Sequence, residues 1–222
     1  LAMPQALHPG LALVIQGVRR CGKSTLLQQL LGRYQLDPSG CLFINFEDPR
    51  LSGGLDYALL DEIVAAFVRQ RGVGAELVFL LDEIQWVQGW ERWLRTQLDQ
   101  AVHRFVVTGS NAQLLSGELA TTLTGRQLTA ELQPFSLGEA RSLLPSLTTE
   151  RYVNGGGFPG ALKVGPDGPQ LLRTYFSDIV TRDVRERVAA RSARPVLQVA
   201  QMAFEAAGSE LSYRRVAAAA GV

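Results

Sequence analysis

Residues 17–24, which read Gly-Val-Arg-Arg-Cys-Gly-Lys-Ser, have the residue types and the spacing to hold a chain of phosphates. Their pattern is G-x-x-x-x-G-K-S, in which the glycines allow the backbone to turn successive N–H groups toward an anion. We expect the Lys23 ammonium to reach the β- and γ-phosphates of a nucleoside triphosphate, and the Ser24 hydroxyl to bind Mg²⁺. A glycine-rich turn that matches by chance is the alternative.

The flanking residues favour the phosphate-binding interpretation. An apolar run over 11–15 precedes the loop and a leucine-rich run over 25–31 follows it, so strand, loop and helix come in the order that this motif requires. The helix N-terminus adds about half a positive charge at the same point. Arginines in the loop add positive potential or face solvent, and its cysteine is interpreted as a filler. The residues predicted to contact the nucleotide are Gly17, Val18, Arg19, Arg20, Cys21, Gly22, Lys23, Ser24 and Thr25.

A pair of acidic residues, Asp82 and Glu83, follows the unbroken apolar run 77–81. Such a run is typical of a buried parallel strand, which delivers its last residues to the sheet edge that also carries the phosphate loop. There Asp82 can hold Mg²⁺, and Glu83 can orient or deprotonate the water that attacks the γ-phosphate. The alternative is an acidic pair on the surface. A hydrolytic glutamate argues against an enzyme that phosphorylates a small molecule.

A polar segment, Thr108-Gly-Ser-Asn, comes at the end of the next predicted strand, whose apolar residues are 105–107. Its side chains would reach the same sheet edge, where Thr108, Ser110 or Asn111 could contact the γ-phosphate or the attacking water. An ordinary turn at a strand end is the competing interpretation. The sequence contains no N-K-x-D motif, which argues against a GTPase of the Ras kind.

Strand and helix patterns alternate over 10–132, which predicts an α/β fold with a wound parallel sheet. After Pro134 the strand patterns disappear and helices are expected instead. The strands are predicted over 11–15, 41–46, 77–81, 104–108 and 127–132, and the helices over 24–34, 56–71, 90–101, 111–124, 137–144, 169–187 and 195–207.

This change predicts three parts: a nucleotide-binding core over 1–133, a helical lid over 134–194, and the start of a winged-helix or helix-turn-helix segment over 195–222. Ser212 is a suitable cap for a last helix that ends at Gly221, so the second helix of such a motif is expected beyond residue 222. That segment motivates an alternative hypothesis, a DNA-associated adaptor.

The composition is that of a folded domain, because 46% of the 222 residues are hydrophobic. A net charge of +1 neither requires nor excludes nucleic acid. The two cysteines form no C-x-x-C pair, and no apolar segment approaches the roughly 20 residues of a membrane span. We therefore expect a cytoplasmic protein without a membrane partner.

Taken together, these motifs resemble those of AAA+ ATPases. More narrowly, the chain resembles a prokaryotic family of predicted AAA+ ATPases, similar to STAND and archaeal-type ATPases, whose members have a winged-helix segment and an uncharacterised C-terminal domain. Besides the motifs above, the matching phrases are Ile44-Asn-Phe-Glu-Asp-Pro-Arg, Leu81-Asp-Glu-Ile-Gln, Gly89-Trp-Glu, Gly125-Arg126, Leu132-Gln-Pro-Phe-Ser-Leu-Gly-Glu, Gly156-Gly-Phe-Pro and Arg182-Asp-Val.

The resemblance implies a P-loop NTPase with a five-stranded sheet in the order 5-1-4-3-2, a helical lid, and ATP with Mg²⁺ as ligands. It also implies that Arg126 reaches the γ-phosphate of a neighbouring subunit in a homo-oligomer, whereas a structural or solvated arginine is the competitor. Two hypotheses follow: an ATPase that couples hydrolysis to conformational change, and a slow-turnover nucleotide switch with a DNA or protein client. The family's C-terminal domain is absent from these 222 residues, and the lid shows no clear sensor-2 arginine motif.

Overall fold

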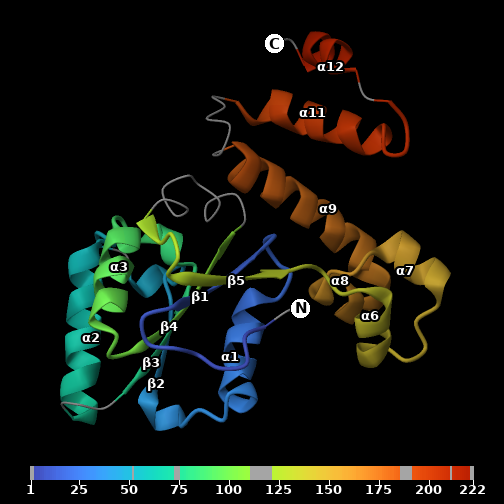
Figure 1. Cartoon of the computed structure of the whole chain (residues 1–222). Helices are drawn as coiled ribbons and strands as arrows, with labels where there is room; N and C mark the ends of the chain where they lie inside the picture. Colours follow the sequence, from blue (N-terminus) through green and yellow to red (C-terminus); the bar gives the residue numbers. More distant parts are fainter. Residues whose placement is uncertain are drawn as a thin grey trace. The chain divides into compact units, whose positions relative to one another are not determined.

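The structure is a computed structural model that describes residues 3–51, 53–72, 76–110, 122–185, 192–210 and 212–220. The chain divides into two compact units, Leu1–Gln133 and Pro134–Val222 (Figure 1).

The first unit alternates strands and helices along the chain (Figure 1). Every strand begins within one residue of its predicted start. Apolar runs mark the first four, whereas β5, Gln-Leu-Thr-Ala-Glu-Leu, is less apolar. The helix predicted over 111–124 falls mostly on residues 111–121, which lie outside the described residues. The elements are β1 (Ala12–Gly17), α1 (Lys23–Arg33), η1 (Pro38–Gly40), β2 (Cys41–Asn45), η2 (Pro49–Leu51), α2 (Tyr57–Arg71), β3 (Val78–Asp82), η3 (Ile84–Trp86), α3 (Trp90–Gln100), β4 (Arg104–Ser110) and β5 (Gln127–Leu132).

The five strands form one parallel sheet in the order β2-β3-β4-β1-β5. Counted from β5, this is the predicted order 5-1-4-3-2, which is thereby confirmed. The register pairs Gly17 with Ser110 on one side and with Leu132 on the other, and it pairs Asn45 with Asp82. All five strands therefore end along the same edge, and the residues after them share that edge.

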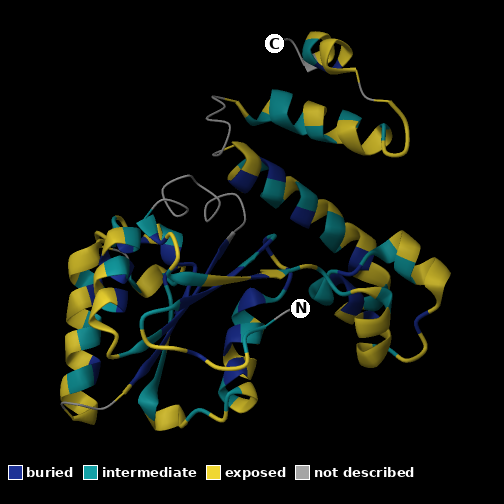
Figure 2. Ribbon diagram, in the orientation of Figure 1, coloured by how far each residue is buried: buried dark blue, intermediate teal, exposed yellow. Residues whose placement is uncertain are grey.

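Helices cover both faces of this sheet, with α1 on one face and α2 and α3 on the other (Figure 1). Leu13 of β1 packs in the cluster of Leu27 from α1, whereas Phe79 of β3 packs in the cluster of Leu60 and Leu94 from α2 and α3. Figure 2 shows that the buried residues follow the strands and the sheet-facing sides of these helices. Burial of each such side chain contributes about 1.5–3 kcal/mol, so the sheet is a firm support for the loops at its edge.

All elements of the second unit within the described residues are helical, as the sequence predicts after Pro134. Gly157 packs directly against the segment that precedes the first of these helices: the Gly157 carbonyl accepts a hydrogen bond from Phe135 N–H at 2.8 Å, and a Cβ at Gly157 would lie 2.0 Å from Phe135 O. Two short helices, α7 and α8, were not predicted, and the helix predicted over 169–187 is α9 continuing into a π-helical segment, η5. The elements are α6 (Leu137–Leu143), α7 (Thr149–Gly155), α8 (Pro159–Lys163), η4 (Gly165–Asp167), α9 (Gly168–Asp178), η5 (Ile179–Val184), α11 (Ala193–Glu205) and α12 (Tyr213–Ala220).

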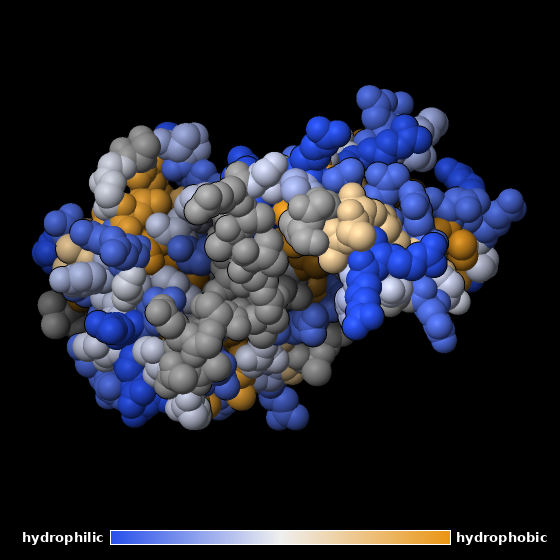
Figure 3. Space-filling view, turned by 90° about the horizontal axis from the view of Figure 1, so that it is seen from above, coloured by the Kyte–Doolittle hydropathy of each residue, from blue (hydrophilic) through white to orange (hydrophobic). Residues whose placement is uncertain are grey.

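Within the described ranges, no helix has the length and hydropathy needed to cross a membrane. Seen from above, the described surface is largely hydrophilic with smaller hydrophobic areas between (Figure 3).

Candidate nucleotide-binding site

The loop between β1 and α1 has a shape that depends on two glycines. A Cβ on Gly17 would lie 2.3 Å from Leu132 O and 2.8 Å from Cys21 Sγ, so the end of β1 admits no side chain. Gly22 has φ 109°, a left-handed value that other residues rarely adopt. These two positions explain why the motif has glycine at both ends of the loop.

The cysteine of the loop is a packing residue in this structure. Cys21 is almost completely buried and lies against the end of β1. Burial raises the pKa of its thiol, and the nearby Lys23 ammonium opposes that shift. A buried, protonated thiol is inert.

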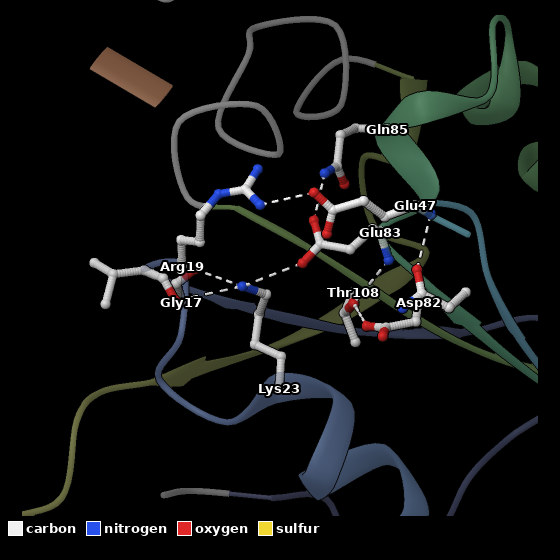
Figure 4. A network of polar contacts seen from close by, with 10 residues as sticks. Gly17, Arg19, Lys23, Glu47, Asp82, Glu83, Gln85 and Thr108 are labelled. Carbon is white, nitrogen blue, oxygen red and sulfur yellow. Dashed lines mark hydrogen bonds and ion pairs between the residues drawn. The ribbon is translucent and has the colours of Figure 1, made fainter. Parts of the chain in front are cut away.

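Lys23, the first residue of α1, turns its side chain back into the loop (Figure 4). Its Nζ donates to Gly17 O at 3.1 Å and to Val18 O at 3.4 Å, and it lies 3.5 Å from Glu83 Oε1. The ammonium is thus held in the cradle where a phosphate chain is predicted, by acceptors that a more negative ligand can replace.

Thr108 of β4 joins the ends of two strands. Its hydroxyl donates a hydrogen bond to Asp82 Oδ1 at 2.5 Å and accepts one from Glu83 N–H at 3.1 Å. A hydroxyl has a single hydrogen, so in this arrangement Thr108 offers no donor to a phosphate and instead positions the two acidic residues. Ser110 ends β4 opposite Gly17, but its side chain and the whole of Asn111 lie outside the described residues.

Asp82 has a carboxylate oxygen that fits a metal site. Its side chain is completely buried, and Oδ2 has no hydrogen-bond partner among the described residues. Burial raises the pKa of this carboxyl group, and the hydroxyls of Ser24 and Thr108 oppose the shift. An orphaned anionic oxygen in the company of a serine hydroxyl is a donor set suited to Mg²⁺, directly or through water.

The remaining ligands of such a metal would have to come from phosphate and water. No group of three or more His, Cys, Asp or Glu residues in the described ranges could hold a metal ion by itself. That arrangement suits Mg²⁺, which usually binds one or two carboxylates, substrate phosphates and several waters.

Two further side chains at the site, Glu47 and Gln85, were not assigned a role from the sequence. Arg19 Nη1 donates to Glu47 Oε1 at 2.8 Å, and Gln85 Nε2 donates to Glu83 Oε2 at 2.6 Å (Figure 4). Their position in the sequence could have identified them, because they follow the carboxyl ends of the neighbouring strands β2 and β3. A pocket of about 210 Å³ is lined by Arg19, Arg20, Gly22, Lys23, Ser24, Thr25, Glu47 and Glu83.

Arg126 lies at the opposite edge of the sheet from the phosphate loop. Its carbonyl accepts a hydrogen bond from the N–H of Ala12, the first residue of β1, whereas the loop begins at Gly17, the last. Five residues of strand separate these points by roughly 16 Å. The Arg126 guanidinium pairs with Asp99 of α3 at 2.6 Å. Arg126 is therefore not brought to the nucleotide site of its own chain.

Comparison with known proteins also points to the part of the chain that carries the five strands and the phosphate loop. A family model described as "AAA domain" matches residues 10–141. An uncharacterized protein of Methanocaldococcus jannaschii is 29% identical over 228 residues, which cover 95% of this chain and 50% of the relative. An uncharacterized protein of Haemophilus influenzae is 32% identical over 190 residues, which cover 80% and 47%. The chain thus spans about half the length of these curated relatives.

Two solved structures are also similar. AMPPCP-bound DnaA from Aquifex aeolicus is 12% identical with a TM-score of 0.46, covering 95% of this chain and 76% of that one. A DNA polymerase III gamma subunit-related protein from Thermotoga maritima is 11% identical with a TM-score of 0.45, covering 86% and 65%. The family model, by contrast, spans more than half of the 222 residues, including all five strands and the phosphate loop. By this match, the chain belongs to the AAA domain family of P-loop proteins.

Proposed function

We propose that this chain binds ATP together with Mg²⁺ at the edge of the sheet and hydrolyses it. Membership of the AAA domain family indicates a nucleotide-binding protein. The observation that carries the proposal is the convergence of Lys23 from the start of α1 with Asp82 and Glu83 from the end of β3, with the orphaned Asp82 Oδ2 among them. A mere glycine-rich turn has no reason to gather a buried ammonium and two buried acidic residues.

In this proposal the loop N–H groups and the Lys23 ammonium bind the β- and γ-phosphates. Ser24 and Asp82 would hold Mg²⁺, which would supply positive charge to the phosphate oxygens. Glu83 accepts a proton from water while the water oxygen attacks the γ-phosphorus. The bond from the γ-phosphorus to the bridging oxygen breaks, and ADP leaves with the bonding electron pair.

The ion pair between Lys23 and Glu83 links binding to this chemistry. A triphosphate carries more negative charge than one carboxylate, so it should draw the ammonium away from Glu83 Oε1, which now lies 3.5 Å from it. The carboxylate oxygen then becomes available to a water molecule. In this proposal, triphosphate binding releases Glu83 from its ion pair with Lys23.

Other expectations stay proposals of a wider kind. We propose that nucleotide state is coupled to conformational change, that Arg126 acts between subunits of a homo-oligomer, and that the chain belongs to the narrower subfamily named above. We also propose a cytoplasmic location. Two free cysteines, Cys21 and Cys41, support that location. The DNA-associated alternative rests on α11 and α12, where α12 begins with exposed Tyr213, Arg214 and Arg215. Salt-dependent binding to duplex DNA would support that alternative.

The decisive experiment is ATP hydrolysis by the Glu83→Gln variant in the presence of Mg²⁺. We expect the turnover rate to fall about 10²- to 10⁴-fold, because the amide cannot accept the proton, while ATP affinity stays within a few-fold of that of the unaltered protein. Glu62→Gln, on the exposed face of α2, is the matched control and should hydrolyse normally. Unchanged turnover in Glu83→Gln would show that Glu83 is not the base, and absence of Mg²⁺-dependent turnover in the unaltered protein would refute the function.

A further inference from the structure

Gln85 makes a contact that suggests a role in the reaction. It lies in η3, the short helix that follows β3, and its Nε2 donates to Glu83 Oε2 at 2.6 Å. Figure 4 shows its amide next to the Glu83 carboxylate. No part of the mechanism proposed above uses Gln85.

The backbone holds this amide in place. Glu83 has φ 55° and ψ 45°, a left-handed conformation that is uncommon for a residue other than glycine. This conformation turns the chain sharply after β3 into η3, where Trp86 N–H donates to Glu83 O at 3.2 Å and Val87 N–H to Ile84 O at 2.9 Å. Ile84 is fully buried and anchors the turn. Strained residues of this kind concentrate at functional sites, and here the strain brings Gln85 back onto the carboxylate.

The other end of the amide is unsatisfied. Gln85 Oε1 is buried, and within the described part of the chain it has no hydrogen-bond partner. Rotating the amide by half a turn would place its oxygen against the Glu83 carboxylate, two acceptors facing each other, so the hydrogen bond to Oε2 fixes which atom is the oxygen. A buried acceptor without a donor is costly, by about 1–3 kcal/mol, and calls for an explanation.

A water molecule at this point would satisfy both groups. Water has two hydrogens, and the neighbouring acceptors are the Glu83 carboxylate and Gln85 Oε1. With one hydrogen bonded to each, a lone pair of the water oxygen remains for attack. A glutamine that orients an attacking water is known chemistry in phosphoryl transfer.

We propose that Gln85 is a water-positioning residue, whose amide nitrogen orients Glu83 and whose amide oxygen accepts a hydrogen bond from the water that attacks the γ-phosphate. This inference rests on the proposed hydrolysis. In the step itself, the water gives one proton to Glu83, keeps the hydrogen bonded to Gln85, and forms the new bond to phosphorus. Gln85 exchanges no proton.

The test compares Gln85→Met, which keeps the length of the side chain and removes both polar atoms, with the unaltered protein. The expected result is a kcat lower by about 10²-fold with KM for ATP changed less than about twofold, since the amide touches the water and not the nucleotide. Affinity for ADP with aluminium fluoride should fall in parallel, while affinity for a non-hydrolysable ATP analogue is retained. Gln88→Met, at an exposed glutamine of the following segment, is the control.

The outcomes separate a failure of this inference from a failure of the proposed function. If the unaltered protein hydrolyses ATP and Gln85→Met does so at the same kcat, the inference is wrong and the proposed function stands. If the variant loses binding of the ATP analogue, or if its melting temperature falls enough to account for the lost turnover, Gln85 has a structural role only. If the unaltered protein binds ATP without hydrolysing it, the proposed function fails first, and the inference falls with it.

Discussion

Lys23 Nζ lies 3.5 Å from Glu83 Oε1, and the two side chains are almost enclosed, with 4% and 11% of their surfaces exposed. The cation of the phosphate loop is therefore paired with the predicted base. Because these charges have little access to water, removing either one would leave the other buried without its ion-pair partner.

Lys23→Met should destabilise the protein by roughly 1–3 kcal/mol, because it leaves the Glu83 carboxylate buried without its cation. It should also abolish measurable ATP binding. Urea unfolding and a fluorescent ATP analogue measure the two effects. Lys163→Met, at an exposed lysine, is the control. The double variant with Glu83→Gln should recover stability without recovering affinity. A double variant no more stable than the single one would contradict the pairing.

Thr108→Val should lower the free energy of unfolding by about 1–3 kcal/mol, because it removes the partner of Asp82 Oδ1 and of Glu83 N–H while keeping the volume. ATP turnover should fall as well, since both acidic residues lose their positioning. Thr108→Ser should restore both properties. The control is Thr129→Val, at an exposed position of β5. Equal unfolding curves for Thr108→Val and Thr129→Val would show that the Thr108 hydroxyl does not contribute to the free energy of unfolding.

Asp82→Asn should stabilise the nucleotide-free protein at neutral pH, because burial raises the pKa of this carboxyl group when folded. The unfolded group titrates near pH 3.9, so its stabilising effect is complete below that pH and is lost as pH rises through the higher folded pKa. The gap between variant and unaltered protein should therefore widen from about pH 4 upward and then level off. Denaturant unfolding across this range measures it.

The same Asp82→Asn variant tests the metal. Mg²⁺ added with a non-hydrolysable ATP analogue should raise the melting temperature of the unaltered protein, and chelation should reverse the increase. The variant should lose most of this Mg²⁺-dependent part. An identical response in both proteins would remove Asp82 from the metal site.

Glu47→Gln should bind ATP about 3- to 10-fold more tightly, a change of about 1 kcal/mol, because Glu47 places a negative charge in the pocket and holds Arg19. Its effect on stability should stay below about 1 kcal/mol, since the Glu47 side chain is 39% exposed. Asp48→Asn, whose carboxylate pairs with Arg50 outside the pocket, should leave the affinity unchanged. Weaker binding by Glu47→Gln would mean that the pair with Arg19 supports the bound loop instead.

Arg126 can act on a nucleotide only in another copy of the chain, given its place at the far edge of the sheet and its pair with Asp99. On the proposal that Arg126 acts between subunits, Arg126→Ala and Lys23→Ala proteins should each be inactive and should regain ATPase activity when mixed. Asp99→Asn keeps the arginine and loosens its tether, so it should remain active. Mixtures no more active than their parts would leave Arg126 with a structural role.

Much of the site could be predicted because its parts are local. The order of strand, loop and helix around 17–24 follows from an apolar run, two glycines and a leucine-rich stripe. Glycine at 17 and 22 reflects a close approach to Leu132 and a left-handed backbone, both visible as a sequence motif. Asp82 and Glu83 were expected at the sheet edge because parallel strands end there together.

The contacts that link these parts depend on which strands are neighbours, and the hydrophobic pattern of a strand does not name its neighbour. Only the assembled sheet places β3 between β2 and β4, so that Thr108 reaches Asp82 from 26 residues away. The same packing brings Glu47 to Arg19 across 28 residues. The sequence by itself thus determined the phosphate loop, the acidic strand end and the α/β alternation, which arise from backbone preferences and local hydrophobic periodicity. Tertiary structure decided the partners of each charge, because burial and hydrogen bonding between distant segments exist only once the sheet is packed.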